Sequence, residues 1–314
     1  MATGLAWAAE GERPNLRDNH SPRSPLCRDC RHGRLSRPMR RSSPGHTLEG
    51  IVVHGSVHNE SADIAYDQIG DGPVLLMVAG AGGTGDVYRK AALRLSDSYS
   101  VITYDRRCNG RSTGDRTRAM DMAQQARDAL EIIRAAEVDG AYVFGNSGGA
   151  NIALMLTEMH PEVVRGLVAH EPPVVSILPD ADVWLKFVDE ITDTFHSKGP
   201  KRAMLRFARS GVGVNPLKLL LARSGGRPDL RFFLEHEYVP ITTYDPNTTS
   251  LLRCGVPIVT LAGRGSKDAY YARTAPILAQ KVGGHFSTIS GNHFAFLLSP
   301  DTFARELRLA LGSF

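Results

Sequence analysis

The chain has 314 residues, of which 42% are hydrophobic and 22% are charged, and its formal net charge is +4. Residues 1–48 contain nine Arg, no Lys and four acidic residues, so residues 49–314 carry a net charge of only −1. This composition is typical of a globular protein with a large core, and a near-neutral folded part lacks the basic surface that phosphate binding requires. We therefore expect no nucleic-acid partner.

No apolar run approaches the roughly 20 residues that a transmembrane helix needs. The most apolar run, Val74–Ala81, is far shorter, and Leu5–Ala9 is too short for the core of a secretory signal. Four cysteines are too few for a disulfide framework. These features predict a cytoplasmic protein with no membrane partner.

Residues 1–48 are rich in Arg, Pro and Ser and show no apolar periodicity, so we expect a disordered, basic N-terminal extension. Cys27, Cys30 and His32 resemble half of a zinc site, but no second pair of ligands follows them, and a structural zinc needs four. We therefore expect no metal.

The rest of the chain alternates between two patterns. Short β-branched and apolar runs predict strands at Ile51–Val53, Ala62–Tyr66, Val74–Ala79, Ser100–Tyr104, Ala141–Phe144, Val164–Ala169, Val256–Ala262 and Phe286–Ile289. Apolar residues three and four positions apart predict helices at Met120–Ala136, Gly149–His160, Tyr271–Val282 and Asp301–Leu311. This alternation predicts an α/β fold with a mostly parallel sheet and helices on both faces, and the first two strands form an antiparallel hairpin.

Gly145-Asn146-Ser147-Gly148-Gly149 is a GxSxG sequence between a predicted strand and a predicted helix. A nucleophile on such a turn is held in a strained conformation and needs small neighbours. The start of the helix also directs free N–H groups toward a developing oxyanion. The alternative is a tight, glycine-lined turn without chemistry, but this context favours Ser147 as a nucleophile.

A serine nucleophile needs a base. His293 follows the last predicted strand and precedes the final helix, where the chain returns to the carboxyl edge of the sheet. The other histidines that we considered, His160, His236 and His285, lie at a helix end, in the segment without strands and before a strand. We expect His293 to be the base, with a buried structural histidine as the alternative.

The order nucleophile, acid, His293 resembles the α/β-hydrolase fold family, and the resemblance covers residues 49–314. Tyr104–Ser112 is similar to the DxRGxGxS turn of that family, with Cys108 in place of its first glycine. In the family, the loop after the third strand supplies an oxyanion N–H. The corresponding loop here has Ala79 where many members have His. The resemblance implies an oxyanion hole formed by the N–H groups of Ala81 and Gly148.

The acid has two candidates. Most family members place Asp two or three residues after the glycine that ends a late strand, but Gly265 and Ser266 stand there, and the next acid is Asp268. Glu171 follows the strand Val164–Ala169 and lies at a second location known for the acid in this fold, as in lactonases that open zearalenone. We favour Glu171 and retain Asp268 as the alternative.

Residues 174–250 contain no convincing strand, so we expect them to form a helical cap after the sixth strand, between core segments 49–173 and 251–314. A cap that excludes water favours apolar substrates and offers a surface for a homodimer. This segment is rich in aromatic residues: Trp184, Phe187, Phe195, Phe207, Phe232, Phe233, Tyr238 and Tyr244.

These features predict a serine hydrolase with the triad Ser147, Glu171 and His293, which cleaves an apolar or aromatic ester or lactone through an acyl-enzyme and uses no cofactor. Carbon–carbon bond hydrolases and cofactor-free peroxidases of this fold use similar triads and remain alternatives. A binding protein that retains the fold without turnover is another. Epoxide hydrolases and dehalogenases are disfavoured, because they need a carboxylate nucleophile and Ser147 occupies that position.

Overall fold

The computed structural model describes residues 52–209 and 229–314. By its internal contacts the chain separates into residues 1–47 and residues 48–314, and every element below belongs to the second unit. The predicted disordered extension and the Cys27–Cys30 pair lie outside the described residues.

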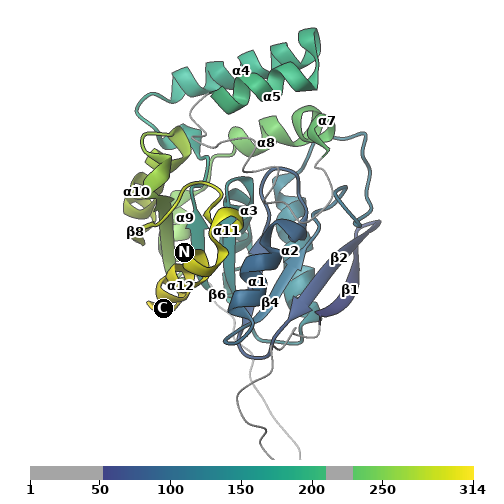
Figure 1. Ribbon diagram of the computed structural model, residues 1–314, viewed down its shortest axis with the longest axis vertical. Coiled ribbons are helices and arrows are strands. Elements are labelled where there is room, and N and C mark those ends of the chain that lie inside the picture. Colours follow the sequence, from purple (N-terminus) through teal and green to yellow (C-terminus); the bar gives the residue numbers. More distant parts are fainter. Residues whose placement is uncertain (1–51, 210–228) are drawn as a thin grey trace, which may run out of the picture. The chain divides into compact units, whose positions relative to one another are not determined.

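The centre of this unit is an eight-stranded sheet with the strand order β1-β2-β4-β3-β5-β6-β7-β8 (Figure 1). β1 pairs antiparallel with β2, β2 pairs antiparallel with β4, and the remaining pairs are parallel. The strands are β1 Val52–Asn59, β2 Ala62–Ile69, β3 Val74–Val78, β4 Ser100–Tyr104, β5 Ala141–Asn146, β6 Val164–His170, β7 Ile258–Gly263 and β8 His285–Ile289. The predicted α/β fold and the antiparallel hairpin are confirmed.

β1 and helix α1, Arg89–Leu95, are two of the elements that differ from the prediction. β1 runs for eight residues, Val52–Asn59, rather than stopping at Val53, because it pairs with β2 along its whole length as an edge strand. Its exposed His and Ser side chains gave no apolar signal. Helix α1 was not predicted, since seven residues are too few for a clear amphipathic period.

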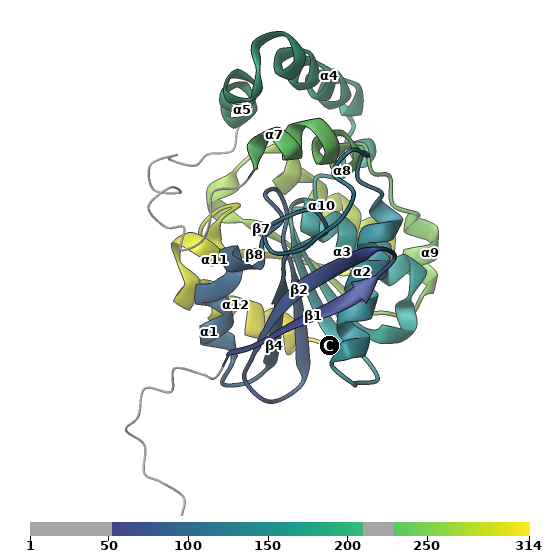
Figure 2. The ribbon, with the colours of Figure 1, turned by 90° about the vertical axis from the view of Figure 1, so that its right-hand side faces the viewer.

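Helices cover both faces of the sheet (Figure 2). Alternate residues of β3 show the division: Leu76 and Val78 pack into the core on the side of α2 and α3, whereas Leu75 and Met77 pack with α1 and α12. The helices of this layer structure are α2 Met122–Ala135, α3 Gly148–Met159, α10 Tyr270–Val282, α11 Ala295–Leu298 and α12 Pro300–Leu311. Burial of both faces explains why β3 and β4 are buried at every position.

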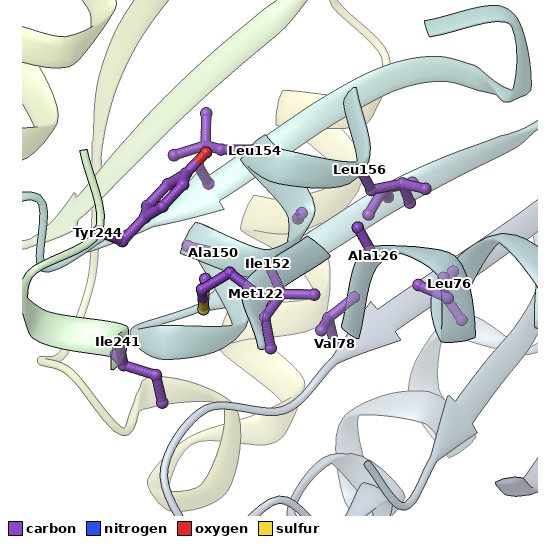
Figure 3. Close-up of a cluster of buried hydrophobic side chains, with 14 of the residues drawn as sticks. Leu76, Val78, Met122, Ala126, Ala150, Ile152, Leu154, Leu156, Ile241 and Tyr244 are labelled. Carbon is purple, nitrogen blue, oxygen red and sulfur yellow. The ribbon is translucent and has the colours of Figure 1, made fainter. Parts of the chain in front are cut away.

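Between β6 and β7 the described residues form helices and no strand. They comprise the short helix η3 Val175–Ile177, α4 Ala181–Lys198, α5 Pro200–Arg209, α7 Leu230–Phe232, the π-helix η4 Phe233–Glu237, α8 Tyr238–Thr242 and α9 Thr248–Arg253. Ile241 and Tyr244 from this insertion join the same buried cluster as Ala150 and Ile152 of α3 (Figure 3). Among the described residues, no helix is both long and apolar enough to cross a bilayer.

Candidate active site

Ser147 lies on the turn between β5 and α3 with φ 54° and ψ −131°, a backbone conformation that residues other than glycine rarely adopt. The turn brings backbones into close contact: a methyl group on Gly149 would lie 2.1 Å from the Val78 carbonyl oxygen, and one on Gly145 would lie 2.4 Å from the Gly149 carbonyl oxygen. Only glycine fits these two positions. The Ser147 hydroxyl does not cap the helix that it precedes, so it is available for chemistry.

Glu171 and His293 meet at the same edge of the sheet. Glu171 directly follows β6, and His293 lies between β8 and α11. Glu171 Oε2 is 2.7 Å from His293 Nδ1, while Glu171 Oε1 accepts a hydrogen bond from the N–H of Gly263 at 2.8 Å. Because a carboxylate only accepts, His293 Nδ1 carries the proton and Nε2 presents its lone pair.

The Glu171 carboxylate is fully buried and ionised. Burial raises its pKa, but the hydrogen bond from His293 and the electrostatic attraction of His293 and His170 more than compensate, so the pKa of Glu171 lies below its ordinary value. Its φ of 49° places it in the left-handed region, as for Ser147. Asp268, the other candidate acid, is exposed on the turn that follows β7.

Asn146 is the last residue of β5. It connects the ends of β5 and β6 to the loop that carries His293. Its side-chain Nδ2 donates to the His293 carbonyl oxygen at 3.2 Å and to His170 Nδ1 at 3.0 Å. A carbonyl only accepts, so this contact determines the orientation of the amide, and His170 Nδ1 must then be an unprotonated acceptor. His170 is fully buried, and burial lowers its pKa to about 4, although the charge of Glu171 opposes the shift.

In the described part of the chain, no hydrogen bond joins the Ser147 hydroxyl to His293. Their loops are nevertheless tied together, since Asn146 contacts the His293 main chain and the Ser147 N–H donates to the His170 carbonyl at 3.0 Å. Catalytic hydrogen bonds are often long without substrate and shorten when substrate binds.

The predicted oxyanion loop lies directly against the serine turn. A methyl group on Gly80 would be 3.0 Å from Ser147 Cβ and 3.3 Å from the Gly148 nitrogen. Ala81 follows Gly80 and is exposed, and Gly148 is the first residue of α3, where backbone N–H groups lack partners within the helix. The loop that carries Ala81 therefore lies against the turn that carries Ser147 and Gly148.

The insertion between β6 and β7 reaches this site. A methyl group on Gly148 would lie 2.8 Å from Ile241 Cδ1, so the Ile241 side chain of α8 fills the space beside the serine turn. The buried Asn151 side chain of α3 donates to the Ile241 carbonyl oxygen at 2.9 Å and holds α8 there. The expected base also has an aromatic neighbour: the Tyr271 ring packs against His293 with ring centroids 4.3 Å apart.

The sequence did not indicate the contacts that Asn146 and His170 make at this site. Asn146 stands inside the GxSxG sequence and His170 precedes Glu171, so both positions were visible, but nothing in the spacing indicated that their side chains meet.

No cluster of three or more His, Cys, Asp or Glu side chains is arranged to hold a metal ion within residues 52–209 and 229–314.

Known proteins resemble this chain in sequence and in structure. The model of a protein family described as the α/β-hydrolase fold matches residues 73–211. The chain is 27% identical over 261 residues to the uncharacterized hydrolase YraK of Bacillus subtilis. This match covers 82% of this chain and 95% of YraK. RutD of Azorhizobium caulinodans, provisionally named a carbamate hydrolase, is 34% identical over 110 residues, or 35% of this chain and 41% of RutD.

Among solved structures, an α/β-hydrolase from Sphaerobacter thermophilus is similar with a TM-score of 0.62 at 25% identity, over 81% of this chain and 98% of that one. The similarity therefore extends over most of both chains. Together with the strand order and the strand–turn–helix at Ser147, these matches show that the chain has the α/β-hydrolase fold.

Proposed function

We propose that the protein is a serine hydrolase that cleaves a carboxylic ester or lactone through an acyl-enzyme. The observation that carries this proposal is the buried 2.7 Å contact between Glu171 Oε2 and His293 Nδ1, at the sheet edge where Ser147 occupies a strained turn. An ionised carboxylate that fixes the imidazole tautomer is what activation of a serine hydroxyl requires. The naming of YraK as a hydrolase agrees with it.

In the first half of the reaction, Ser147 Oγ attacks the carbonyl carbon and its proton passes to His293 Nε2. Glu171 stabilises the imidazolium that forms. The N–H groups of Ala81 and Gly148 bind the oxyanion of the tetrahedral intermediate. Collapse of this intermediate breaks the bond to the alkoxide, which takes the proton from His293, and leaves the acyl group on Ser147.

In the second half, His293 removes a proton from water, and the resulting hydroxide attacks the acyl carbon. The new tetrahedral intermediate collapses to release the acid, and Ser147 regains its proton from His293. If the substrate is a lactone, the alkoxide formed in the first half remains attached to the acyl chain. One product, a hydroxy acid, then leaves.

The helices between β6 and β7 act in this proposal as a cap. Ile241 lies against Gly148, and the insertion contributes the buried rings of Phe233 and Tyr238. Such surroundings exclude water and favour an apolar or aromatic acyl group. We therefore expect esters with long or aromatic acyl groups, or aromatic lactones, to be better substrates than acetates.

The serine and histidine roles are tested by Ser147→Ala, His293→Ala and the double variant, assayed on p-nitrophenyl esters of graded chain length and on aromatic lactones. Each single change should lower kcat by at least about 10⁴-fold, and the double variant should be little worse, because the residues act as one unit. A fluorophosphonate probe should label Ser147. Folded protein that is not labelled would favour a binding protein, and labelling without turnover of esters or lactones would favour a carbon–carbon bond hydrolase.

The acid is tested by comparing two carboxylates. Glu171→Gln should lower kcat by about 10³-fold or more, since an amide does not stabilise the imidazolium and can favour the wrong tautomer. Asp268→Asn is the matched control and should retain most of the activity, because Asp268 is exposed. The reverse ranking would assign the acid to Asp268.

A further inference from the structure

Arg106 is fully buried, and all five of its side-chain N–H groups have partners. Nε donates to the Ala79 carbonyl oxygen at 3.0 Å, and Nη2 donates to the Gly80 carbonyl oxygen at 3.1 Å. The two Nη atoms also form a bidentate ion pair with Glu237 at 2.9 and 2.8 Å, and Nη1 lies 3.4 Å from Gln125 Oε1. One side chain thus binds the oxyanion loop and the insertion together.

The contact with Gly80 determines where the Ala81 N–H points. The Gly80 carbonyl and the Ala81 N–H belong to the same peptide unit, which is planar and trans, so the two bonds point in opposite directions. The Gly80 carbonyl oxygen accepts from Arg106 Nη2 and, at 3.1 Å, from the N–H of Gly83. These two donors fix the direction of the Gly80 carbonyl. The Ala81 N–H is therefore held pointing away from them.

The backbone of Arg106 strengthens this arrangement, because its N–H donates to the Gly83 carbonyl oxygen at 2.7 Å. The loop is thereby held at Ala79, Gly80 and Gly83 by one residue. The loop also lies within van der Waals distance of the Ser147 turn, as the contact at Gly80 shows. A small rotation of this peptide would move the Ala81 N–H away from the oxyanion.

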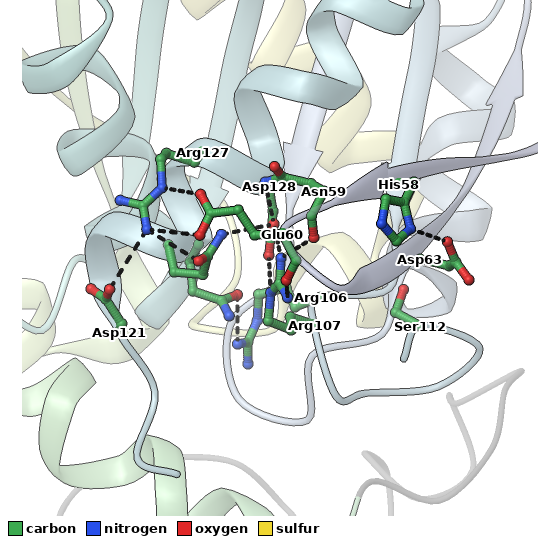
Figure 4. A network of polar contacts seen from close by, with 12 residues as sticks. His58, Asn59, Glu60, Asp63, Arg106, Arg107, Ser112, Asp121, Arg127 and Asp128 are labelled. Carbon is green, nitrogen blue, oxygen red and sulfur yellow. Dashed lines mark hydrogen bonds and ion pairs between the residues drawn. The ribbon is translucent and has the colours of Figure 1, made fainter. Parts of the chain in front are cut away.

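Glu237 comes from the insertion, at the end of the π-helix η4, and its side chain is 2% exposed. Asn109 Nδ2 donates to Glu237 Oε1 at 2.8 Å, and the neighbouring His236 carbonyl accepts from the Met120 N–H at 2.8 Å. Figure 4 shows Arg106 within the polar network beside α2. A buried guanidinium needs a carboxylate partner, so the orientation of Arg106 depends on the position of the insertion.

We propose that Arg106 is a positioning residue for the oxyanion hole and that Glu237 couples it to the insertion, so the Ala81 N–H is correctly placed only while η4 is seated. This inference rests on the proposed function, since it concerns the same oxyanion. It assigns to the insertion a part in catalysis besides substrate binding. Misplaced oxyanion donors affect the transition state more than the bound substrate.

Two variants test the positioning. Arg106→Lys keeps the charge but cannot bind two carbonyls and a carboxylate in one plane, and Glu237→Gln removes the charge that orients the guanidinium. Both should lower kcat by about 10- to 100-fold with little change in KM. Affinity for a trifluoromethyl ketone, which forms an oxyanion adduct with the serine, should fall by the same factor.

Asp128→Asn is the matched control. Asp128 is fully buried and forms a bidentate pair with the neighbouring Arg107, but this pair contacts the β1–β2 turn rather than the oxyanion loop. The control should retain kcat. An equal loss of kcat in Asp128→Asn and Glu237→Gln would overturn the proposal, because general destabilisation would then explain both.

The double variant Arg106→Met/Glu237→Met separates positioning from folding, since buried ion pairs can often be replaced by apolar residues without loss of stability. We expect it to fold and still to show the reduced kcat and the weakened inhibitor binding. A folded double variant with the activity and inhibitor affinity of the wild type would contradict the proposal while leaving the serine mechanism intact.

Hydrogen exchange tests the coupling without any assay of activity. The amides of residues 80–83 should exchange faster in Glu237→Gln than in the wild type, and Asp128→Asn should leave them unchanged. Unchanged exchange in Glu237→Gln would refute the coupling even if the enzyme proved active. If the wild type neither turned over esters nor reacted with fluorophosphonate, the proposed function would fail and this measurement would still decide the coupling.

Discussion

Ser147 and Glu171 are two non-glycine residues with positive φ that directly follow neighbouring strands. Each such conformation costs on the order of 1–3 kcal/mol and persists only where the surroundings impose it. Here the next strand imposes it: the Ser147 N–H donates to the His170 carbonyl, and the Glu171 N–H donates to the Leu261 carbonyl at 2.9 Å. The sheet therefore holds both side chains above its carboxyl edge.

His170 makes stability depend on pH. Its pKa is about 4 in the folded protein and about 6.5 in an unfolded chain, so between these values the unfolded state binds the extra proton. The stabilisation is fully present above pH 6.5 and is lost as the pH falls toward 4, by about 3 kcal/mol in total. Protonation of Nδ1 would also break the contact with Asn146.

Urea unfolding at pH 7.5, 6 and 5 measures this dependence. The His170→Asn variant is the informative comparison, because its Oδ1 can replace Nδ1 as the acceptor for Asn146 and does not titrate. The free energy of unfolding should fall less in the variant than in the wild type over this range. Parallel curves for the two proteins would show that His170 is not the titrating group. The lowered pKa of Glu171 adds a loss of stability in the same direction at more acidic pH.

At the scale of elements, α8 is the part of the insertion that contacts the serine turn. Asn151 anchors its backbone, and Ile241 faces Gly148, while Val239 on the same helix is 39% exposed. The helix therefore presents one side chain toward the site and another toward solvent. This division makes α8 a candidate determinant of acyl-group selectivity.

Ile241→Ala should open space beside the nucleophile. The ratio of kcat/KM for a bulky acyl ester to that for a short one should rise by about tenfold, since a few methylene groups in an apolar pocket are worth about 1–3 kcal/mol. Stability should fall by about 2–4 kcal/mol because Ile241 is buried. Val239→Ala is the control on the same helix and should leave the ratio unchanged. An unchanged ratio in both variants would place the acyl group elsewhere.

At the scale of the whole molecule, the sheet, its helices and every proposed site residue lie within residues 52–314. Removing residues 1–48 should therefore leave kcat/KM and the melting temperature unchanged. The truncated protein should also lose retention on a polyanionic column, since the removed segment carries nine Arg and the remainder has a net charge of −1. Loss of activity in a truncated protein that still folds would make this segment part of the enzyme.

The buried parallel strands were predictable because each is a short apolar run, as Val74–Val78 and Ser100–Tyr104 show. The length of β1 was not, because an edge strand is held by its backbone pairing with β2 and needs no apolar side chains. In the same way, the bond between Arg106 and Glu237 joins residues 131 positions apart, and no local pattern indicates such a pairing.

The sequence by itself determined the fold class and the placement of Ser147 on a strand-to-helix turn and of His293 after the last strand, because these depend on periodicity and local spacing. It left Glu171 and Asp268 open, since both follow parallel strands that end at one edge. Only the tertiary structure decided which carboxylate lies beside His293: Glu171 is 2.7 Å away and buried, and Asp268 is exposed. That choice depends on distances between side chains from different strands, which chain order does not specify.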